Sequence, residues 1–255
     1  MKIDLNSDLG EDFGIYKIKL NEELFKIISS ANVACGFHAG DPDVISNIVL
    51  KLKKADTQIG AHPGFKDLEG FGRRQIYMSK EEIKNMIIYQ LGALDAFLKI
   101  NGLKMQHVKP HGALYNLAQR DKDVAESIVD AVFLFDRDLI ILGLPESEVN
   151  NSAYKRGIKF ANEVFADREY DDSGFLVPRK IKGSVINDPV ICKERVFNMI
   201  QNKKIKSING KIIDINPHSI CVHGDNENSF KIIKEIKLNF YEKGIEISPL
   251  KDICK

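Results

Sequence analysis

Residues that could move protons or hold anions follow several short β-type runs of this chain. They share acidic, imidazole or cationic side chains, and the set is Asp8, Glu11, His38, His62, Lys109, His111, Asp167, Arg168, His223 and Asp225. Carboxylates and imidazoles can act as general acids and bases, while lysine and arginine can stabilise an oxyanion or a phosphate. The set predicts an enzymatic site if the fold gathers these residues.

Residues 108–116, Val-Lys-Pro-His-Gly-Ala-Leu-Tyr-Asn, hold these polar side chains at the highest density along the chain. Pro110 cannot donate to a central strand ladder, and Gly112 permits unusual backbone angles. A strand should therefore end here and display Lys109 and His111 at its carboxyl end. Such a stretch is typical of an active-site loop in a β/α fold.

Four histidines lie close to a glycine just after a predicted strand: His38, His62, His111 and His223. A single histidine of this kind more often packs at a strand end than takes part in chemistry. Several that converge favour a functional site instead.

Short β-rich runs alternate with amphipathic helical runs along the chain. Strands are predicted at 2–6, 32–35, 58–61, 105–108, 139–142, 159–165 and 220–222, with helices at 21–30, from 41, 79–102, 121–135, 146–156, from 188, and at 227–243. Asn209-Gly210 predicts a hairpin between 204–208 and 211–215, and 245–247 is a possible last strand. The alternation predicts one α/β domain over residues 1–255, a barrel of about seven strands.

In a parallel barrel the carboxyl ends of all strands share one rim, so the ten residues would converge there. Alternation along the first strand places Asp4, Asn6 and Asp8 on one face, opposite Ile3 and Leu5. A solvated edge strand would explain this pattern. We instead expect the polar face inside the barrel, hydrogen-bonded, because Ile3 and Leu5 can face the surrounding helices.

Composition excludes some classes of partner. Lys and Arg number 37 against 36 Asp and Glu, so a net charge of +1 gives no reason to expect nucleic acid or an anionic membrane. No apolar segment is long enough to span a bilayer and the start of the chain reads as a strand, so a cytoplasmic protein is expected. The four cysteines lack C-x-x-C spacing and should be reduced, with Cys35 and Cys221 in the core.

Seven motifs spread over the whole chain resemble those of the LamB/YcsF family. They are Asp-Leu-Asn-Ser-Asp-Leu-Gly-Glu from Asp4, Asn-Val-Ala-Cys-Gly-Phe-His-Ala-Gly-Asp from Asn32, Gly-Ala-His-Pro-Gly from Gly60, Phe-Gly-Arg-Arg from Phe71, the stretch 108–116, Phe-Ala-Asp-Arg from Phe165 and Val-His-Gly-Asp from Val222. Their joint occurrence in this order is specific, and no motif residue is missing.

The resemblance implies a distorted β/α barrel similar to the glycoside hydrolase/deacetylase superfamily. It also implies the reaction of ATP-dependent 5-oxoprolinase, which opens 5-oxoproline to glutamate and cleaves ATP to ADP and phosphate, together with partner subunits B and C. Within that reaction, Asp8 with His38 or His62 would activate water, Lys109 and Arg168 would stabilise oxyanion or phosphate charge, and His111 or His223 would donate a proton.

The sequence does not identify where ATP would bind. The sequence has no G-x-x-x-x-G-K-[ST], so other rim loops or another subunit must hold any nucleotide. Arg73 and Arg74, with Lys109 and Arg168, are candidates to face phosphate. Adjacent surface arginines or a flexible lid over residues 70–74 would explain the first two equally well.

A divalent metal is a further possibility, with Asp8, His38 and His62 as candidate ligands. His107 and His111 are four residues apart, but on an extended segment this spacing does not form a metal clamp. Two other functions remain open: a stand-alone metal-dependent amidase or deacetylase-like hydrolase, and a binding subunit whose chemistry lies in its partners. A homo-oligomer is also possible.

Overall fold

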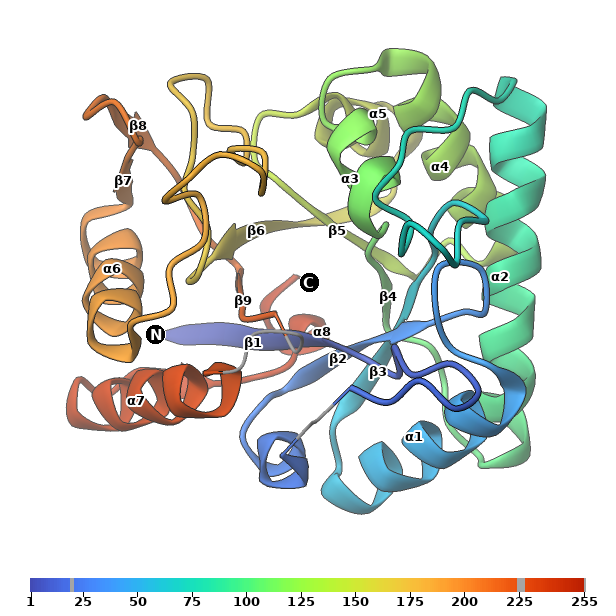
Figure 1. Ribbon diagram of the computed structural model, residues 1–255, viewed down its shortest axis with the longest axis horizontal. Coiled ribbons are helices and arrows are strands. Elements are labelled where there is room, and N and C mark those ends of the chain that lie inside the picture. Colours follow the sequence, from blue (N-terminus) through green and yellow to red (C-terminus); the bar gives the residue numbers. More distant parts are fainter. Residues whose placement is uncertain (19–20, 224–227, 255) are drawn as a thin grey trace.

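A closed barrel of seven parallel strands forms the centre of the computed structural model, which describes residues 1–18, 21–223 and 228–254. Strand β9 pairs with both β6 and β1, and this closes the ring (Figure 1). The strands are β1 (Lys2–Leu9), β2 (Ser30–Ala34), β3 (Gln58–His62), β4 (His107–Val108), β5 (Ile140–Gly143), β6 (Lys159–Phe165) and β9 (Ser219–Cys221). The predicted barrel of about seven strands is confirmed.

Most helices surround this ring, whereas the short α8 (Leu250–Ile253) lies within the outline of the ring in this view (Figure 1). The other helices are α1 (Pro42–Ala55), α2 (Lys80–Ile100), α3 (Gly112–Ala118), α4 (Lys122–Phe135), α5 (Glu148–Arg156), α6 (Pro189–Asn202) and α7 (Ser229–Glu242). Local chemistry fixes where several of them begin. The Asp41 side chain accepts from the Val44 N–H ahead of Pro42, and Ser79 forms a capping box with Glu82. No helix in the described ranges is long and apolar enough to cross a membrane.

The predicted helix over 21–30 is wrong. Only a 3-10 helix forms there, η1 (Glu22–Lys26), because the following residues join the barrel. The Ser29 N–H donates to the Leu5 carbonyl, and Ser30 pairs with Asn6 as the first residue of β2. Strand pairing therefore overrides helical pattern in this segment.

The later half of the chain also contains a short hairpin and a separate short strand. The predicted hairpin is confirmed as the antiparallel pair β7 (Lys204–Lys206) and β8 (Ile212–Asp214), joined across Asn209-Gly210. The predicted last strand is β10 (Glu246–Ile247), which pairs in parallel with the start of β1 outside the closed ring. Both α3 and α8 lack a counterpart in the sequence-based prediction.

The polar face of β1 points into the barrel, as expected. Asp4 and Asn6 are fully buried, and Asp8 is 6% exposed. Asn6 Nδ2 donates to Glu163 Oε1 at 3.0 Å, and Asn32 Nδ2 donates to Asn6 Oδ1 at 2.8 Å. The hydroxyls of Ser29, Ser30 and Ser219 donate to Asp4. Hydrogen bonds thus satisfy these buried polar groups, so the barrel interior is a polar network.

Candidate active site

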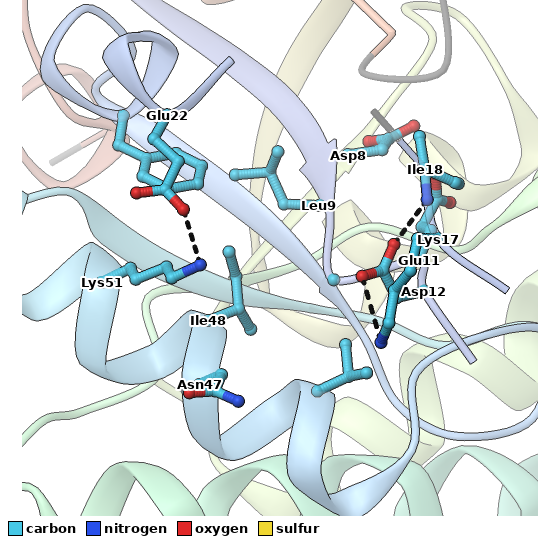
Figure 2. Close-up of a pocket in the computed structure, with 13 residues that line it drawn as sticks. Asp8, Leu9, Glu11, Asp12, Lys17, Ile18, Glu22, Asn47, Ile48 and Lys51 are labelled. Carbon is cyan, nitrogen blue, oxygen red and sulfur yellow. Dashed lines mark hydrogen bonds and ion pairs between the residues drawn. The ribbon is translucent and has the colours of Figure 1, made fainter. Parts of the chain in front are cut away.

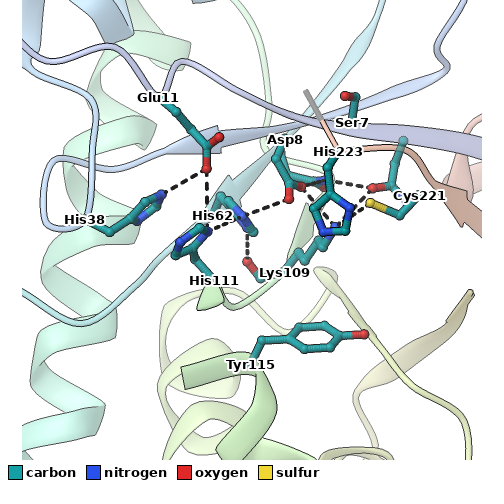
Figure 3. A network of polar contacts seen from close by, with 12 residues as sticks. Ser7, Asp8, Glu11, His38, His62, Lys109, His111, Tyr115, Cys221 and His223 are labelled. Atoms are coloured by element: carbon teal, nitrogen blue, oxygen red, sulfur yellow. Dashed lines mark hydrogen bonds and ion pairs between the residues drawn. The ribbon is translucent and has the colours of Figure 1, made fainter. Parts of the chain in front are cut away.

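Most of the predicted site residues lie at the carboxyl rim of the barrel, around one cavity of about 640 Å³. Asp8 comes from the end of β1, His62 from the end of β3, and Lys109 from the residue after β4 (Figure 3). The predicted residues that line the cavity are Asp8, Glu11, His62, Arg73, Lys109, His111, Arg168 and His223. The structure therefore gathers chain segments more than 200 residues apart.

Three predicted residues lie elsewhere. His38 lies behind the cavity wall against His111, and Asp167 is buried behind His223. Arg74 forms an ion pair with Asp67 and does not line the cavity. Asp225 falls outside the described residues.

Lys109 is a buried cation at the floor of the cavity. Its Nζ lies 2.9 Å from Asp8 Oδ1, 2.8 Å from Glu163 Oε1 and 3.1 Å from Cys221 Sγ. Burial lowers the pKa of Lys109, but Asp8, Cys221 and Glu163 outweigh it and hold this pKa well above its usual value. Lys109 is therefore an ammonium group at neutral pH.

Asp8 is correspondingly a carboxylate. Burial raises its pKa, yet the neighbouring His62 and Lys109 hold the pKa well below its usual value. Its two oxygens have different neighbours, because Oδ1 accepts from Lys109 and Asn32 while Oδ2 lies 3.4 Å from His62 Nε2. One carboxylate thus connects the ammonium group to the imidazoles.

His62 and His111 face each other through nitrogens that carry no hydrogen when the rings are neutral. His62 Nδ1 donates to the Lys109 carbonyl at 2.7 Å, and His111 Nε2 donates to the Phe71 carbonyl at 2.8 Å. Because a carbonyl only accepts, each ring's single hydrogen is fixed there. His62 Nε2 and His111 Nδ1 are left 3.0 Å apart, so the arrangement calls for a cation, a proton or a metal ion, between them.

His38 stacks on His111 with ring centroids 3.7 Å apart and planes 3° apart. Its Nε2 lies 3.4 Å from Glu11 Oε1, and neither ring nitrogen has a hydrogen-bond partner among the described residues. Burial, then His62, lowers the pKa of His38 well below its usual value; burial, then His38, does the same to the pKa of His111. Both rings are neutral at pH 7.

The loop over residues 70–74 covers these histidines. Phe71 has a left-handed φ of 53° that aims its carbonyl at His111, and its ring meets His38 edge-on. A Cβ on Gly72 would lie 2.7 Å from His38 Cβ, and one on Gly112 would lie 2.6 Å from the Gly72 carbonyl oxygen. Both glycines are thus required for this close approach.

A second wall of the cavity is cationic. Arg168 Nη2 donates to the Val177 carbonyl at 2.6 Å, while its Nε is buried without a hydrogen-bond partner among the described residues. Burial, then the nearby Arg179, lowers the pKa of Arg168 to about 10, which leaves it charged at neutral pH. Arg73 and Arg179 line the same cavity, so this wall suits an anionic group.

His223 is held by an acid at the opposite side of the rim from His111. Its Nδ1 lies 2.9 Å from Asp167 Oδ1. Burial raises the pKa of Asp167, but His223 and the arginines Arg179 and Arg168 lower it below its usual value. A carboxylate in this position fixes a hydrogen on Nδ1 and orients the ring.

A smaller cavity of about 360 Å³ shares Asp8 and Glu11 with the large one (Figure 2). It lies beside α1 and η1, where Lys51 Nζ pairs with Glu22 Oε1 at 2.7 Å. Asp8 and Glu11 are therefore accessible from two directions.

Sequence reasoning missed three residues of this region: Glu163, Cys221 as a polar partner, and Arg179. Glu163 is fully buried and binds Lys109, Asn6 and Tyr115, whose hydroxyl donates to Oε2 at 3.0 Å. A charged residue inside strand 159–165, directly before Val164 and Phe165, was the available signal for Glu163. Arg179 lies in a loop and carries no comparable signal.

The donor set fits a divalent ion. Glu11, His38, His62 and His111 each offer a ligand atom within 4.8 Å of the others, and Asp8, Cys221 and His223 form a second such group. Imidazole and carboxylate ligands together suit Zn²⁺ and other first-row divalent metals. The first group overlaps the predicted candidates in His38 and His62, and it contains Glu11 and His111 in place of Asp8.

Fold and site together define a parallel β/α-barrel protein with acids, imidazoles and cations gathered at the carboxyl rim. The model of the LamB/YcsF family matches residues 3–255, and the chain belongs to that family. A curated relative from Campylobacter jejuni, which bears the name of the A subunit of 5-oxoprolinase, is 51% identical over 251 residues and covers 98% of both chains.

Two solved structures have a fold similar to that of this chain. The lactam utilization protein from Thermus thermophilus has a TM-score of 0.91 at 40% identity, covering 97% of this chain and 99% of that one. A T48 deacetylase bound to substrate has a TM-score of 0.50 at 14% identity, covering 98% of this chain and 89% of that one. The second likeness concerns the fold alone, and it agrees with the expected deacetylase-type barrel.

Proposed function

We propose that this chain, as one domain over residues 1–255, is the A subunit of an ATP-dependent 5-oxoprolinase. With subunits B and C it opens 5-oxo-L-proline to L-glutamate while ATP becomes ADP and phosphate. The observation that carries the proposal is the convergence of Asp8, His62, Lys109 and His223 on one cavity. The names of the Campylobacter relative and of the Thermus lactam utilization protein support the lactam substrate.

The chemistry explains why such a site needs both acids and cations. A five-membered lactam is a poor electrophile, and phosphoryl transfer from ATP to its amide oxygen makes the carbonyl carbon open to water. Attack by one water then breaks the ring C–N bond and leaves an acyl phosphate, while the former ring nitrogen gains a proton. A second water hydrolyses the acyl phosphate to the carboxylate and phosphate. A base, an oxyanion stabiliser and a proton donor are therefore required.

The described contacts suggest how these tasks divide among the residues. Asp8, whose Oδ2 lies 3.4 Å from His62 Nε2, takes the proton from water. Lys109 stabilises negative charge on the carbonyl oxygen, because it stays charged between Asp8 and Glu163. His223, whose Nδ1 lies 2.9 Å from Asp167 Oδ1, donates the proton to the ring nitrogen. Arg168 and Arg73 bind the carboxylate or phosphate.

Subunits B and C, ATP and a cytoplasmic location are parts of the proposal that rest on the sequence and the family resemblance. Which subunit holds the nucleotide is left to experiment. Arg73 and Arg168 are the candidates in this chain, whereas Arg74, bound to Asp67, is a weaker one.

The test is to mix this chain with subunits B and C and to measure glutamate formation from 5-oxoproline with and without ATP. The proposal expects glutamate only with ATP, and about 100-fold less or lower still from the Asp8→Asn complex. Unchanged turnover by Asp8→Asn would show that the chemistry lies in the partners.

The clustered metal-type ligands favour one second candidate, a stand-alone metal-dependent amidase. That activity would persist without ATP and without B and C, and a chelator would abolish it. The same assay therefore separates the two functions.

A further inference from the structure

The facing nitrogens of His62 and His111 define the start of an ion site. Both rings donate their hydrogen to a backbone carbonyl on the far side, at 2.7 Å for His62 and 2.8 Å for His111. Metal-bound histidines show this arrangement, since the outer hydrogen bond fixes both tautomer and ring orientation. The two lone pairs then point at a common region from rings that are 89° apart.

Glu11 supplies a third ligand atom. Its Oε1 lies 3.5 Å from His111 Nδ1, and this nitrogen lies 3.0 Å from His62 Nε2. Ligands of a tetrahedral Zn²⁺ ion, with bonds near 2.0–2.1 Å, are separated from one another by about 3.3 Å. The observed separations bracket that value. Glu11, His62 and His111 all line the large cavity, so a fourth position would face it.

His38 has a different place in this cluster. Its ring is parallel to that of His111, with centroids 3.7 Å apart, so an ion in the plane of one ring lies out of the plane of the other. His38 does not line the cavity, and its Nε2 lies 3.4 Å from Glu11 Oε1. It can orient Glu11 but cannot coordinate the same ion alongside His111.

We propose that Glu11, His62 and His111 bind one divalent transition ion of the Zn²⁺ type, with His38 as the positioning residue for Glu11 and the open position toward the cavity. This goes beyond the predicted set of Asp8, His38 and His62, of which it keeps only His62 as a ligand. That the ion serves lactam opening rests on the proposed function, whereas the binding itself does not.

The test measures binding, not turnover. The purified chain is treated with a chelator, dialysed and titrated with Zn²⁺ by calorimetry, and Co²⁺ is followed by its visible absorption. The expected result is one ion per chain. His62→Gln, His111→Gln and Glu11→Gln should each weaken binding by more than about 100-fold, and His38→Gln by about 10-fold, as an outer-shell residue would.

His218→Gln is the matched control, because His218 lies outside the cavity and its Nδ1 contacts the Asn162 N–H at 3.0 Å. It should bind Zn²⁺ like the unmodified chain, and circular dichroism checks that every variant is folded. Absence of Zn²⁺ and Co²⁺ binding by the unmodified chain would overturn the site and leave a shared proton between the rings. Loss of binding in His38→Gln as large as in His111→Gln would overturn the ligand assignment. Metal binding without glutamate formation would overturn only the proposed reaction.

Discussion

The polar residues inside the barrel and the histidines at its rim are all buried, yet their hydrogen bonding differs. In the interior, His107 Nε2 donates to Asn32 Oδ1 at 2.6 Å, and its Nδ1 accepts from Gln106. At the rim, both ring nitrogens of His38 lack a hydrogen-bond partner among the described residues, and two bare nitrogens of His62 and His111 face each other.

The interior forms a hydrogen-bonded network without any further group, whereas the rim histidines have unpaired ring nitrogens in the described part of the chain. Burial, then Lys109, lowers the pKa of His107 to about 3, so that ring is neutral and fully paired. A buried polar group without a hydrogen-bond partner destabilises the folded state, and such groups are rare in native proteins. The rim histidines are therefore the part of the barrel where we propose that an ion binds, and changes in the two regions should affect different measurements.

The largest effect is expected where the two regions meet, at Lys109. Lys109→Met leaves Asp8 and Glu163 buried without their cation, which should cost about 3–5 kcal/mol of unfolding free energy. Urea unfolding measures this. Lys80→Met is the matched control, because Lys80 also contacts two carboxylates, Asp123 and Glu126, but at the exposed surface, and little change is expected there.

If Lys109→Met had the same free energy of unfolding as Lys80→Met, the buried ion pairs of Lys109 would add no more stability than the exposed ion pairs of Lys80. The proposed structural role of the interior network would then be contradicted.

The interior also predicts a pH dependence, through Asp4. Burial outweighs the hydroxyl donors of Ser219, Ser30 and Ser29 and raises the pKa of Asp4 from 3.8 to about 6. The folded state binds this proton more tightly than the unfolded chain, so the stability it adds is present below pH 3.8 and is lost as pH rises through 6. This rise in pKa corresponds to roughly 3 kcal/mol.

Asp4→Asn cannot lose a proton at this position. Its unfolding free energy, measured by urea denaturation from about pH 4 to about pH 7, should gain roughly 2 kcal/mol relative to the unmodified chain across that range. A constant difference at all pH values would show that Asp4 does not titrate as described.

At the rim, a small change should affect activity more than stability. Gly72→Ala places a methyl group 2.7 Å from His38 Cβ and 2.9 Å from His111 Cδ2, at a φ of +63°. The loop must move away from the histidines, and turnover of the reconstituted complex should fall by roughly 10- to 100-fold. Gly92→Ala on α2, where an added Cβ meets nothing within 4 Å, is the control and should keep full activity.

Equal activity of the two alanine variants would mean that the loop over residues 70–74 does not shape the site.

Much of the fold could be predicted because pattern and topology agree. Period-two alternation placed the polar face of β1, and turn signals such as Asn209-Gly210 placed the hairpin. The prediction of a helix over 21–30 was wrong because the pairing of Ser30 with Asn6 is a long-range contact that no local pattern contains. The helix α3 was missed because Pro110 and Gly112 were read as a loop, although Gly112, at a φ of +55°, begins it.

The site was predicted as a set of residues but not as a geometry. Strand ends identified Asp8, His62, Lys109 and His223, since a barrel brings such ends together. The sequence contains no information on which nitrogen of His111 faces His62, because the Phe71 carbonyl that fixes it comes from a loop 40 residues away. Glu163 was missed because a strand residue can face either side of the sheet.

The most direct test of this difference between rim and interior is a paired measurement on His62→Gln. The account predicts that glutamate formation by the complex with subunits B and C falls by about 100-fold or more, while the free energy of unfolding in urea changes by less than about 1 kcal/mol. Full glutamate formation, or a loss of stability as large as that of Lys109→Met, would contradict it.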